Sequence, residues 1–264
     1  MILTIESHLD YWLAGESSAI LQIEAAQDAE QKLVSSHLDL SPYSHLGRVP
    51  AEDNLGERVM LGLSNRITAT YRATVEITRP AVDLAQLSAV PVAYLPGDCV
   101  AHLMNSRYCP GDQFQSFVLA EFGSLSGGPL VLALRDWIAR KIAYVPGSST
   151  PATTALETFV QRKGVCRDFA HMLITLARAA GIPARFASVY APDVKPQDFH
   201  AVADVYLDGA WHLLDATGMA RPEDMARIGV GADAAHAAFL TVYGMATLNA
   251  QWVNVSRAEA SPQT

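Results

Sequence analysis

The sequence predicts an α+β protein in which a small all-β domain precedes a larger domain of helices and antiparallel strands. Three observations support this class. Alternation of apolar and polar residues dominates the first eighty residues, apolar residues recur at helical spacing over residues 131–180, and strand-like sequence returns after residue 183. Because the helices of the second region come before its strands and do not alternate with them, we expect an antiparallel sheet there.

The first eighty residues are predicted to form a small antiparallel β sandwich or barrel. Residues 67–78 alternate apolar and polar side chains throughout, as a strand with one buried face does. Weaker alternation predicts three further strands, over residues 3–11, 19–26 and 58–63. Proline and glycine interrupt these runs and predict the loops between them. We therefore assign residues 1–80 to an N-terminal antiparallel β domain.

A stretch rich in proline and glycine, residues 81–112, is predicted to connect this domain to a second one, residues 113–257, with a flexible tail after it at residues 258–264. Helical spacing predicts a helix over residues 131–142. Thr154 to Glu157 has the form of a capping box and predicts the start of another. A third helix follows, which Gly181 and Pro183 end, and residues 184–190 are predicted to be a strand.

Composition excludes several classes of function. The chain has 264 residues, half of them hydrophobic, and a formal charge of −8, so it lacks the basic surface that nucleic acids and anionic membranes require. It shows no signal peptide and no apolar run of membrane-spanning length. Three cysteines without paired spacing argue against a disulfide framework and favour a cytoplasmic location. No zinc motif is present, and we expect no metal or organic cofactor.

A predicted β-hairpin brings a histidine close to an aspartate. Asp208-Gly209 lies between two strand-like runs and is typical of a two-residue turn, and counting outward from it pairs Val202 with Asp215. Side chains alternate along a strand, so His200 shares a face with Val202 and lies diagonally opposite Asp215, roughly 7–8 Å away by backbone. Asp204 lies farther along the strand, about 13 Å from His200. The geometry therefore selects Asp215 to orient the His200 imidazole.

Cys166 stands where the third predicted helix begins. Unpaired backbone N–H groups and the positive end of the helix dipole favour a thiolate there, and they also favour an oxyanion beside it. Cys99 and Cys109 lie in loop-like sequence with no following helix, and His171 is rotated about 140° away from Cys166 along the helix. Each feature alone also has a structural interpretation, since free cysteines are commonly small buried hydrophobes. Together, the helix-start cysteine, strand histidine and hairpin aspartate have the order of a papain-like catalytic triad.

The sequence around these residues resembles the bacterial transglutaminase-like superfamily. The similarity covers most of the chain and lies in the nucleophile motif Gly164–His171, the following Gly181–Arg185, His200-Ala201 and Asp215-Ala216-Thr217, with outlying likeness at Asn54–Gly56, Ser106–Pro110 and Ala143–Gly147. It implies a papain/transglutaminase-like catalytic core, in which a helix-borne cysteine packs on an antiparallel sheet, and a Cys166–His200–Asp215 triad. The sequence departs from the family pattern at Ala216, where proline is usual, and at Ala232 and His236, where arginine and an acid are usual.

The resemblance implies that the Cys166 sulfur attacks a carbonyl carbon and forms a thioester, with His200 moving the proton. The Cys166 backbone N–H is one expected oxyanion donor. Tyr144 and Trp137 are further candidates for oxyanion or substrate contact, although each also suits a packing role.

Three functions remain open at this point. We favour a hydrolase of peptide, protein or small-amide substrates (a peptidase, isopeptidase or amidase), because water resolves a thioester unless the site excludes it. The alternatives are a true protein-glutamine transamidase or another N-acyltransferase, and a non-catalytic binding module of the same fold. A phosphate cradle for an acyl-CoA donor is not evident, and an intact triad argues against the binding module. The sequence does not determine the oligomeric state.

Overall fold

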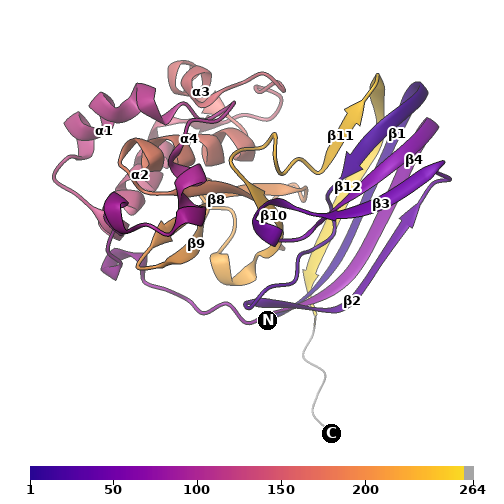
Figure 1. The fold of residues 1–264 in the computed structure, drawn as a ribbon, viewed down its shortest axis with the longest axis horizontal. Coiled ribbons are helices and arrows are strands. Elements are labelled where there is room, and N and C mark those ends of the chain that lie inside the picture. The colour runs from indigo at the N-terminus through magenta and orange to yellow at the C-terminus, as the bar shows by residue number, and fades with distance from the viewer. Residues whose placement is uncertain (259–264) are drawn as a thin grey trace, which may run out of the picture.

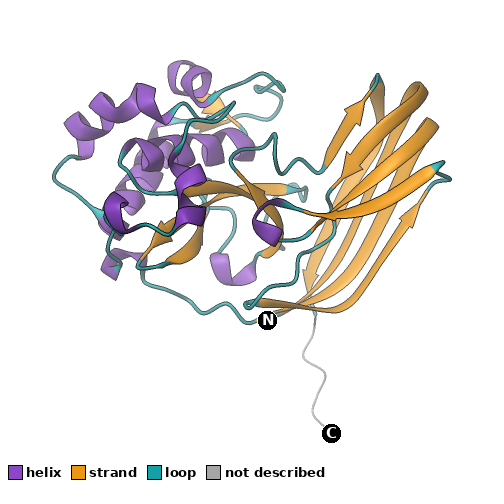
Figure 2. Ribbon diagram, viewed as in Figure 1, coloured by secondary structure: helices purple, strands orange, loops and turns teal. Residues whose placement is uncertain are grey.

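The computed structural model describes residues 1–258, and the predicted tail lies outside this range apart from its first residue. The chain forms two regions that pack side by side (Figure 1). A long, twisted antiparallel sheet lies at the right of this view, and a compact region of helices around a second sheet lies at the left (Figure 2). The α+β class and the N-terminal β domain predicted from the sequence are confirmed.

The N-terminal sheet has two long central strands, β1 (Ile2–Leu21) and β4 (Glu57–Ile77), which pair with each other. Shorter strands cover their outer edges, so the sheet is four strands wide. These are β2 (Gln31–Leu40) and β3 (His45–Pro50) beside β4, and β11 (Leu240–Tyr243) and β12 (Ala246–Arg257) beside β1. All of these pairings are antiparallel.

The predicted strands of the N-terminal region were too short. Residues 3–11 and 19–26 were expected as separate strands, but β1 runs through residues 2–21. The register between β1 and β4 shifts between Trp12 and Glu16, where Gly15 has a φ of 108° and Asn65 on the facing strand has a φ of 65°. A bulge of this kind absorbs extra residues without ending the strand, which local alternation does not reveal.

The N-terminal region forms a single open sheet and not the expected sandwich or barrel. Two strands of this sheet, β11 and β12, come from the C-terminal end of the chain. Residues 240–257, predicted to belong to the second domain, pair with β1 instead; Ile5 faces Val255 and Ser7 faces Val253. A second β layer is unnecessary because the second region covers the inner face. Tyr190, Phe199 and Ile228 of that region share one hydrophobic core with the sheet.

The second region places one helix against an antiparallel sheet of order β10-β7-β8-β9. Its strands are β7 (Ala184–Tyr190), β8 (His200–Leu207), β9 (Ala210–Leu214) and β10 (Ala226–Gly231). The central helix α4 (Cys166–Ala179) packs on β7 and β8 and is surrounded by α1 (Gln115–Phe122), α2 (Gly127–Lys141) and α3 (Ala155–Gln161). The short strands β5 (Ala143–Tyr144) and β6 (Lys163–Gly164) pair in parallel just before α4.

The signals that predicted the start of α3 and the end of α4 are confirmed by the structure. Thr154 caps α3 through the predicted capping box, with the Thr154 side chain accepting from the Glu157 N–H and the Glu157 carboxylate accepting from the Thr154 N–H. Gly181 adopts a φ of 75° after the end of α4. The connecting stretch contains short 3-10 helices, Leu84–Gln86, Val92–Tyr94 and Gly97–Leu103, and no long element.

Buried charges join the two regions. Asp204 of β8 is fully buried and accepts two hydrogen bonds from Arg185 of β7, at 3.0 and 2.8 Å. Arg185 also donates to Asp53 of the N-terminal region at 2.8 Å, and Arg227 of β10 donates to Glu30 at 3.0 Å. Buried charges are tolerated when they are paired in this way. This network fixes the N-terminal loops against the catalytic sheet.

Candidate active site

The β8–β9 hairpin has the predicted register and brings His200 to Asp215. Tyr206 faces Trp211 and Asp204 faces Leu213 across the Asp208-Gly209 turn, as counted from the sequence. The His200 Nε2 atom lies 3.0 Å from Asp215 Oδ2, and both side chains are buried. A carboxylate at this distance fixes the ring orientation and tautomer of a histidine.

Asp215 is held by the turn that follows it. Oδ1 accepts from the Thr217 N–H at 2.8 Å and from the Thr217 hydroxyl at 2.7 Å, and Oδ2 accepts from the N–H groups of Met219 and Ala220 at 3.0 and 2.9 Å. Burial raises the pKa of Asp215, but the hydrogen bonds from His200 and Thr217 outweigh it and hold the pKa below its usual value. The carboxylate therefore stays charged beside His200. The turn keeps this geometry with Ala216 in place of the family's proline.

Cys166 is the first residue of α4, and a buried aspartate fixes this helix start. Asp168 accepts from the Val165 N–H at 2.8 Å and from the Ser149 hydroxyl at 2.9 Å. A Cβ atom on Gly164 would lie 2.7 Å from the Asp168 Cβ, so only glycine leaves room for this arrangement. Sequence reasoning missed the positioning role of Asp168, although an acid at the third position of a helix is a recognisable cap signal.

Arg167, the residue after Cys166, makes its hydrogen bonds to the loop before α3. Its guanidinium donates to the Ser149 hydroxyl and the Thr150 carbonyl, both at 2.6 Å. This residue therefore fastens the loop before α3 to the start of α4.

His200 lies between Asp215 and Cys166. Its Nε2 faces the carboxylate, and its Nδ1 is buried without a hydrogen-bond partner among residues 1–258. Burial lowers the pKa of His200, but Asp215 and the neighbouring Cys166 together raise it to about 9. An imidazole held in this way takes up a proton readily. Cys166 itself is partly exposed, as a nucleophile must be.

Of the two predicted oxyanion or substrate contacts, one lies at the site and one does not. Burial and the neighbouring Cys166 raise the pKa of the Tyr144 phenol to about 12, so Tyr144 keeps its proton next to the sulfur. Trp137 instead stacks on Phe159, with ring centres 5.7 Å apart, and the Arg162 guanidinium lies 5.0 Å from its ring centre. Trp137 is a core residue of the helical layer, because α2 turns that face toward α1 and α3.

The other cysteines and the helix histidine are buried. Burial raises the pKa of Cys99 to about 11 and that of Cys109 to about 12, so both thiols remain protonated. His171 stacks on Tyr108 with ring centres 4.9 Å apart, and burial lowers its pKa to about 3. Its Nε2 accepts from the Ala234 N–H at 3.2 Å, so it is a neutral packing residue.

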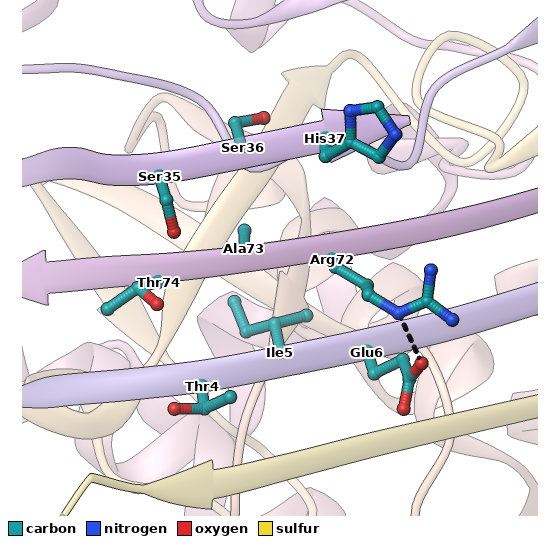
Figure 3. Close-up of a pocket in the computed structure, with 9 residues that line it drawn as sticks. All are labelled: Thr4, Ile5, Glu6, Ser35, Ser36, His37, Arg72, Ala73 and Thr74. Atoms are coloured by element: carbon teal, nitrogen blue, oxygen red, sulfur yellow. Dashed lines mark hydrogen bonds and ion pairs between the residues drawn. The ribbon is translucent and has the colours of Figure 1, made fainter. Parts of the chain in front are cut away.

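A depression of about 300 Å³ lies on the outer face of the N-terminal sheet, away from the catalytic region (Figure 3). Small hydroxyl side chains of β1, β2 and β4 line it, together with the ion pair between Arg72 and Glu6 at 2.7 Å and with His37. No cysteine lines it.

Residues 1–258 contain neither a metal-binding cluster nor a membrane-spanning helix. No group of three metal-ligating side chains is arranged to hold an ion. No single helix there is long and apolar enough to cross a bilayer; residues 111–122 and 127–141 reach that length only as a pair bent by 100°.

Comparison with known proteins agrees with this geometry. Residues 125–216 match the model of the transglutaminase-like superfamily, and residues 1–98 match that of the bacterial transglutaminase N-terminal domain. A solved structure from Cytophaga hutchinsonii, named as a candidate cysteine protease, is 31% identical and aligns over 100% of this chain and 92% of its own, with a TM-score of 0.91.

Two mycobacterial proteins, both named as uncharacterized, match part of the chain. The protein from Mycobacterium leprae (strain TN) is 29% identical over 111 residues, which is 39% of this chain and 40% of that protein. The one from Mycobacterium bovis is 35% identical over 86 residues, 31% of this chain and 27% of that protein. The matches thus span less than half the length of these relatives. Because one relative of more than 30% identity aligns over the whole chain and both family models match, the chain belongs to the transglutaminase-like superfamily and has its papain-like fold.

Proposed function

We propose that this protein is a cysteine hydrolase that cleaves amide bonds through a thioester, with Cys166 as nucleophile, His200 as acid and base, and Asp215 as the orienting carboxylate. The observation that carries the proposal is the position of His200. One ring nitrogen lies 3.0 Å from Asp215, and the other, next to Cys166, is buried without a partner. A histidine held by a carboxylate and facing a thiol at a helix start is the arrangement that activates a sulfur nucleophile.

The reaction follows from this geometry. His200 Nδ1 holds the proton from the Cys166 thiol. The thiolate sulfur then forms a bond to the carbonyl carbon of the substrate, and the electron pair of the C=O π bond moves onto the oxygen. The tetrahedral intermediate then breaks its C–N bond, and His200 returns the proton to the departing amine. The resulting thioester is attacked by water, whose proton passes to His200, and the acid product leaves as the sulfur is released.

Two donors suit the oxyanion of both tetrahedral intermediates. The Cys166 N–H lies at the first position of α4, where helix N–H groups have no partner within the helix. The Tyr144 hydroxyl is the second donor, since the tyrosine remains protonated beside the sulfur. Hydrogen bonds aimed at a developing charge in a partly buried site lower its energy strongly.

We propose hydrolysis of a peptide, protein or small amide in preference to transamidation. Cys166 is partly exposed, so water reaches the thioester, whereas a transamidase must keep water away until an amine arrives. The two outcomes differ only in the second nucleophile, and the same triad serves both.

The first test is alkylation of the native protein by iodoacetamide between pH 4 and 9, with peptide mass spectrometry on all three cysteines. We expect Cys166 to react selectively near pH 6, and this reactivity to disappear in His200→Ala but not in the control His37→Ala, whose ring lies on the exposed face of the N-terminal sheet. An inert Cys166, or one that reacts equally well without His200, would leave the binding module as the better interpretation.

A second test separates hydrolysis from transamidation. A peptide library is incubated in ¹⁸O-labelled water with and without a primary amine, and the products are analysed by mass spectrometry. Hydrolysis incorporates ¹⁸O into the new carboxyl group even in the presence of the amine. Exclusive formation of the amine adduct would overturn the hydrolase proposal and support transamidation.

A further inference from the structure

One exposed acid lies close to the catalytic histidine and is held by the N-terminal sheet. Asp198 is two residues before His200, and two residues span at most about 7 Å. Its Oδ1 accepts from the Phe199 N–H at 2.8 Å and from the Gln251 side-chain amide of β12 at 2.8 Å. Its Oδ2 accepts no hydrogen bond, and Asp198 makes no ion pair, within residues 1–258.

The segment that carries Asp198 is rigidly placed. Phe199 is buried and stacks on Phe239 with ring centres 4.7 Å apart and an interplanar angle of 8°. It also lies against Tyr190, with ring centres 5.6 Å apart. Because this residue is fixed in the core shared by the two regions, the carboxylate on one side of it and His200 on the other keep a constant separation.

The N-terminal sheet lies next to this acid, because Gln251, which donates to Asp198, pairs with Leu9 of β1, and Tyr11 is the next residue on that face of β1. Tyr11 alternates with Leu9 and Leu13 on the inner face of β1, and its cross-strand neighbour Leu248 is 54% exposed. Burial and the charge of Asp198 raise the pKa of Tyr11, and its hydroxyl donates no hydrogen bond within residues 1–258.

The same charge acts on Tyr144, which lies beside Cys166. Asp198 contributes to the raised pKa of this tyrosine. The carboxylate therefore lies within electrostatic reach of both the catalytic centre and the inner face of the N-terminal sheet.

We propose, on the basis of the function proposed above, that Asp198 and Tyr11 form a subsite for a positively charged side chain of a peptide substrate, next to the carbonyl that Cys166 attacks. The free Oδ2 of Asp198 receives the cation, and the Tyr11 ring and Leu248 accommodate its apolar stem. Lysine and arginine side chains have this combination of a long apolar stem and a charged end. The N-terminal sheet thus takes part in substrate selection.

Charged thiol reagents test this subsite without a known substrate. Cationic trimethylammonioethyl methanethiosulfonate and anionic sulfonatoethyl methanethiosulfonate are compared for their rates of reaction with Cys166, with neutral methyl methanethiosulfonate as reference. Asp198→Asn keeps the oxygen that Phe199 and Gln251 contact but removes the charge. We expect it to reduce the ratio of cationic to anionic rates on the order of fivefold, as a unit charge several ångströms away does in moderate salt.

The matched control is Asp193→Asn, which makes the same charge change in the same loop at a residue paired with Arg257. It should leave the ratio unchanged. A ratio that Asp198→Asn does not alter, while Cys166 reacts normally with the neutral reagent, would overturn the subsite and leave the proposed function intact. Failure of the neutral reagent would instead overturn the proposed function, and the subsite with it.

A peptide panel provides the second measurement. Peptides with lysine, norleucine or glutamate beside the cleaved amide are compared by kcat/KM in the native protein and in Asp198→Asn. The proposal expects the preference for lysine over glutamate to fall several-fold in the variant while norleucine is little affected. Equal losses for all three peptides would show that Asp198 has only a structural role.

Discussion

Two buried histidines in this protein each contact an aspartate with nearly the same local geometry. His200 Nε2 lies 3.0 Å from Asp215, and His102 Nε2 lies 2.9 Å from Asp53. In both rings the Nδ1 atom is buried without a partner in the described part of the chain. The proposed function uses only the first pair, so the contrast between them identifies what else a catalytic histidine needs.

The two carboxylates are held differently. Asp215 is buried, and apart from His200 only neutral N–H and O–H groups donate to it. Asp53 is shared with the Arg185 guanidinium at 2.8 Å. The charge of Asp215 is therefore directed to His200 alone, whereas that of Asp53 is divided between a histidine and an arginine.

The partner at the far side of each ring also differs. His200 has the partly exposed Cys166 as its neighbour, whereas the His102 ring meets the edge of Trp211, with ring centres 5.3 Å apart. Cys99, in the same short helix as His102, is buried, and its pKa is raised to about 11. This difference indicates that the histidine–aspartate contact alone does not make a pair reactive. An accessible thiol beside the histidine is also needed.

The largest difference between the two pairs is expected when each histidine is replaced by alanine. We expect His200→Ala to lower any amide hydrolysis by about 10³-fold, because general acid–base catalysis contributes 10²–10⁴-fold. It should lower the alkylation rate of Cys166 near pH 6 by about 10²-fold, because a thiol with an ordinary pKa of about 8.5 is less than about 1% ionised at that pH. His102→Ala should leave Cys166 reactivity within twofold and lower the free energy of unfolding by about 1–3 kcal/mol, since it removes a buried ring and its hydrogen bond to a carboxylate. Pseudo-first-order labelling kinetics and urea denaturation measure the two effects. Equal loss of reactivity in both variants would contradict the distinction.

Substitution of the two aspartates should give a similar but smaller contrast. Asp215→Asn removes the charge that raises the pKa of His200, and we expect a loss of about tenfold in Cys166 reactivity near neutral pH. Asp53→Asn should not change that reactivity. The pH profile of alkylation from pH 4 to 9 measures both. A profile for Asp215→Asn that matches the native protein would show that the carboxylate does not act on the histidine.

A substitution at Arg185 tests whether the Asp53 pair belongs to a network that stabilises the fold. It pairs with buried Asp204 and with Asp53, and it lies 4.0 Å from the Trp211 ring centre. Arg185→Met leaves a buried charge short of its partner, and we expect the free energy of unfolding to fall by roughly 3 kcal/mol.

The control for this substitution is Arg72→Met, which breaks the exposed pair with Glu6 shown in Figure 3. Surface pairs contribute about 0–1 kcal/mol. Urea denaturation that gives equal losses for the Arg185 and Arg72 variants would contradict a structural role for the network.

The smallest expected effect is the change in the free energy of unfolding with pH. His200 has a folded pKa of about 9 against an ordinary value of 6.5, so its stabilisation is fully present below pH 6.5 and is lost as pH rises through 9. We expect the free energy of unfolding to fall by about 2 kcal/mol between pH 6.5 and 8.5 from this group. Asp215→Asn should flatten this slope and Asp53→Asn should not. A native slope of opposite sign in this window would contradict the raised pKa.

Several parts of the site could be predicted because their signals are local. The Asp208-Gly209 turn sets the register of β8 and β9, and counting from it brings His200 to Asp215. The capping box of α3 is likewise read from four consecutive residues. In each case the interacting groups are close in sequence, so their geometry depends little on the rest of the fold.

Other parts could not be predicted because their partners are far apart in sequence. Nothing local to Trp137 indicates that Phe159 and Arg162 cover it, and nothing in residues 240–257 indicates that they pair with β1. The bulge at Gly15 also hides the continuity of β1, because it interrupts the alternation on which strand prediction depends.

The sequence by itself determined the α+β class, the helix start at Cys166, the hairpin register and the identity of the three triad candidates. These follow from periodicity, capping and turn chemistry, which act over a few residues. The tertiary structure alone decided that the N-terminal sheet is open, that the C-terminal strands complete it, and that Gln251 holds Asp198 near the catalytic histidine. The physical reason is that burial of the sheet's inner face against the catalytic region satisfies a hydrophobic surface that no local pattern assigns to a partner.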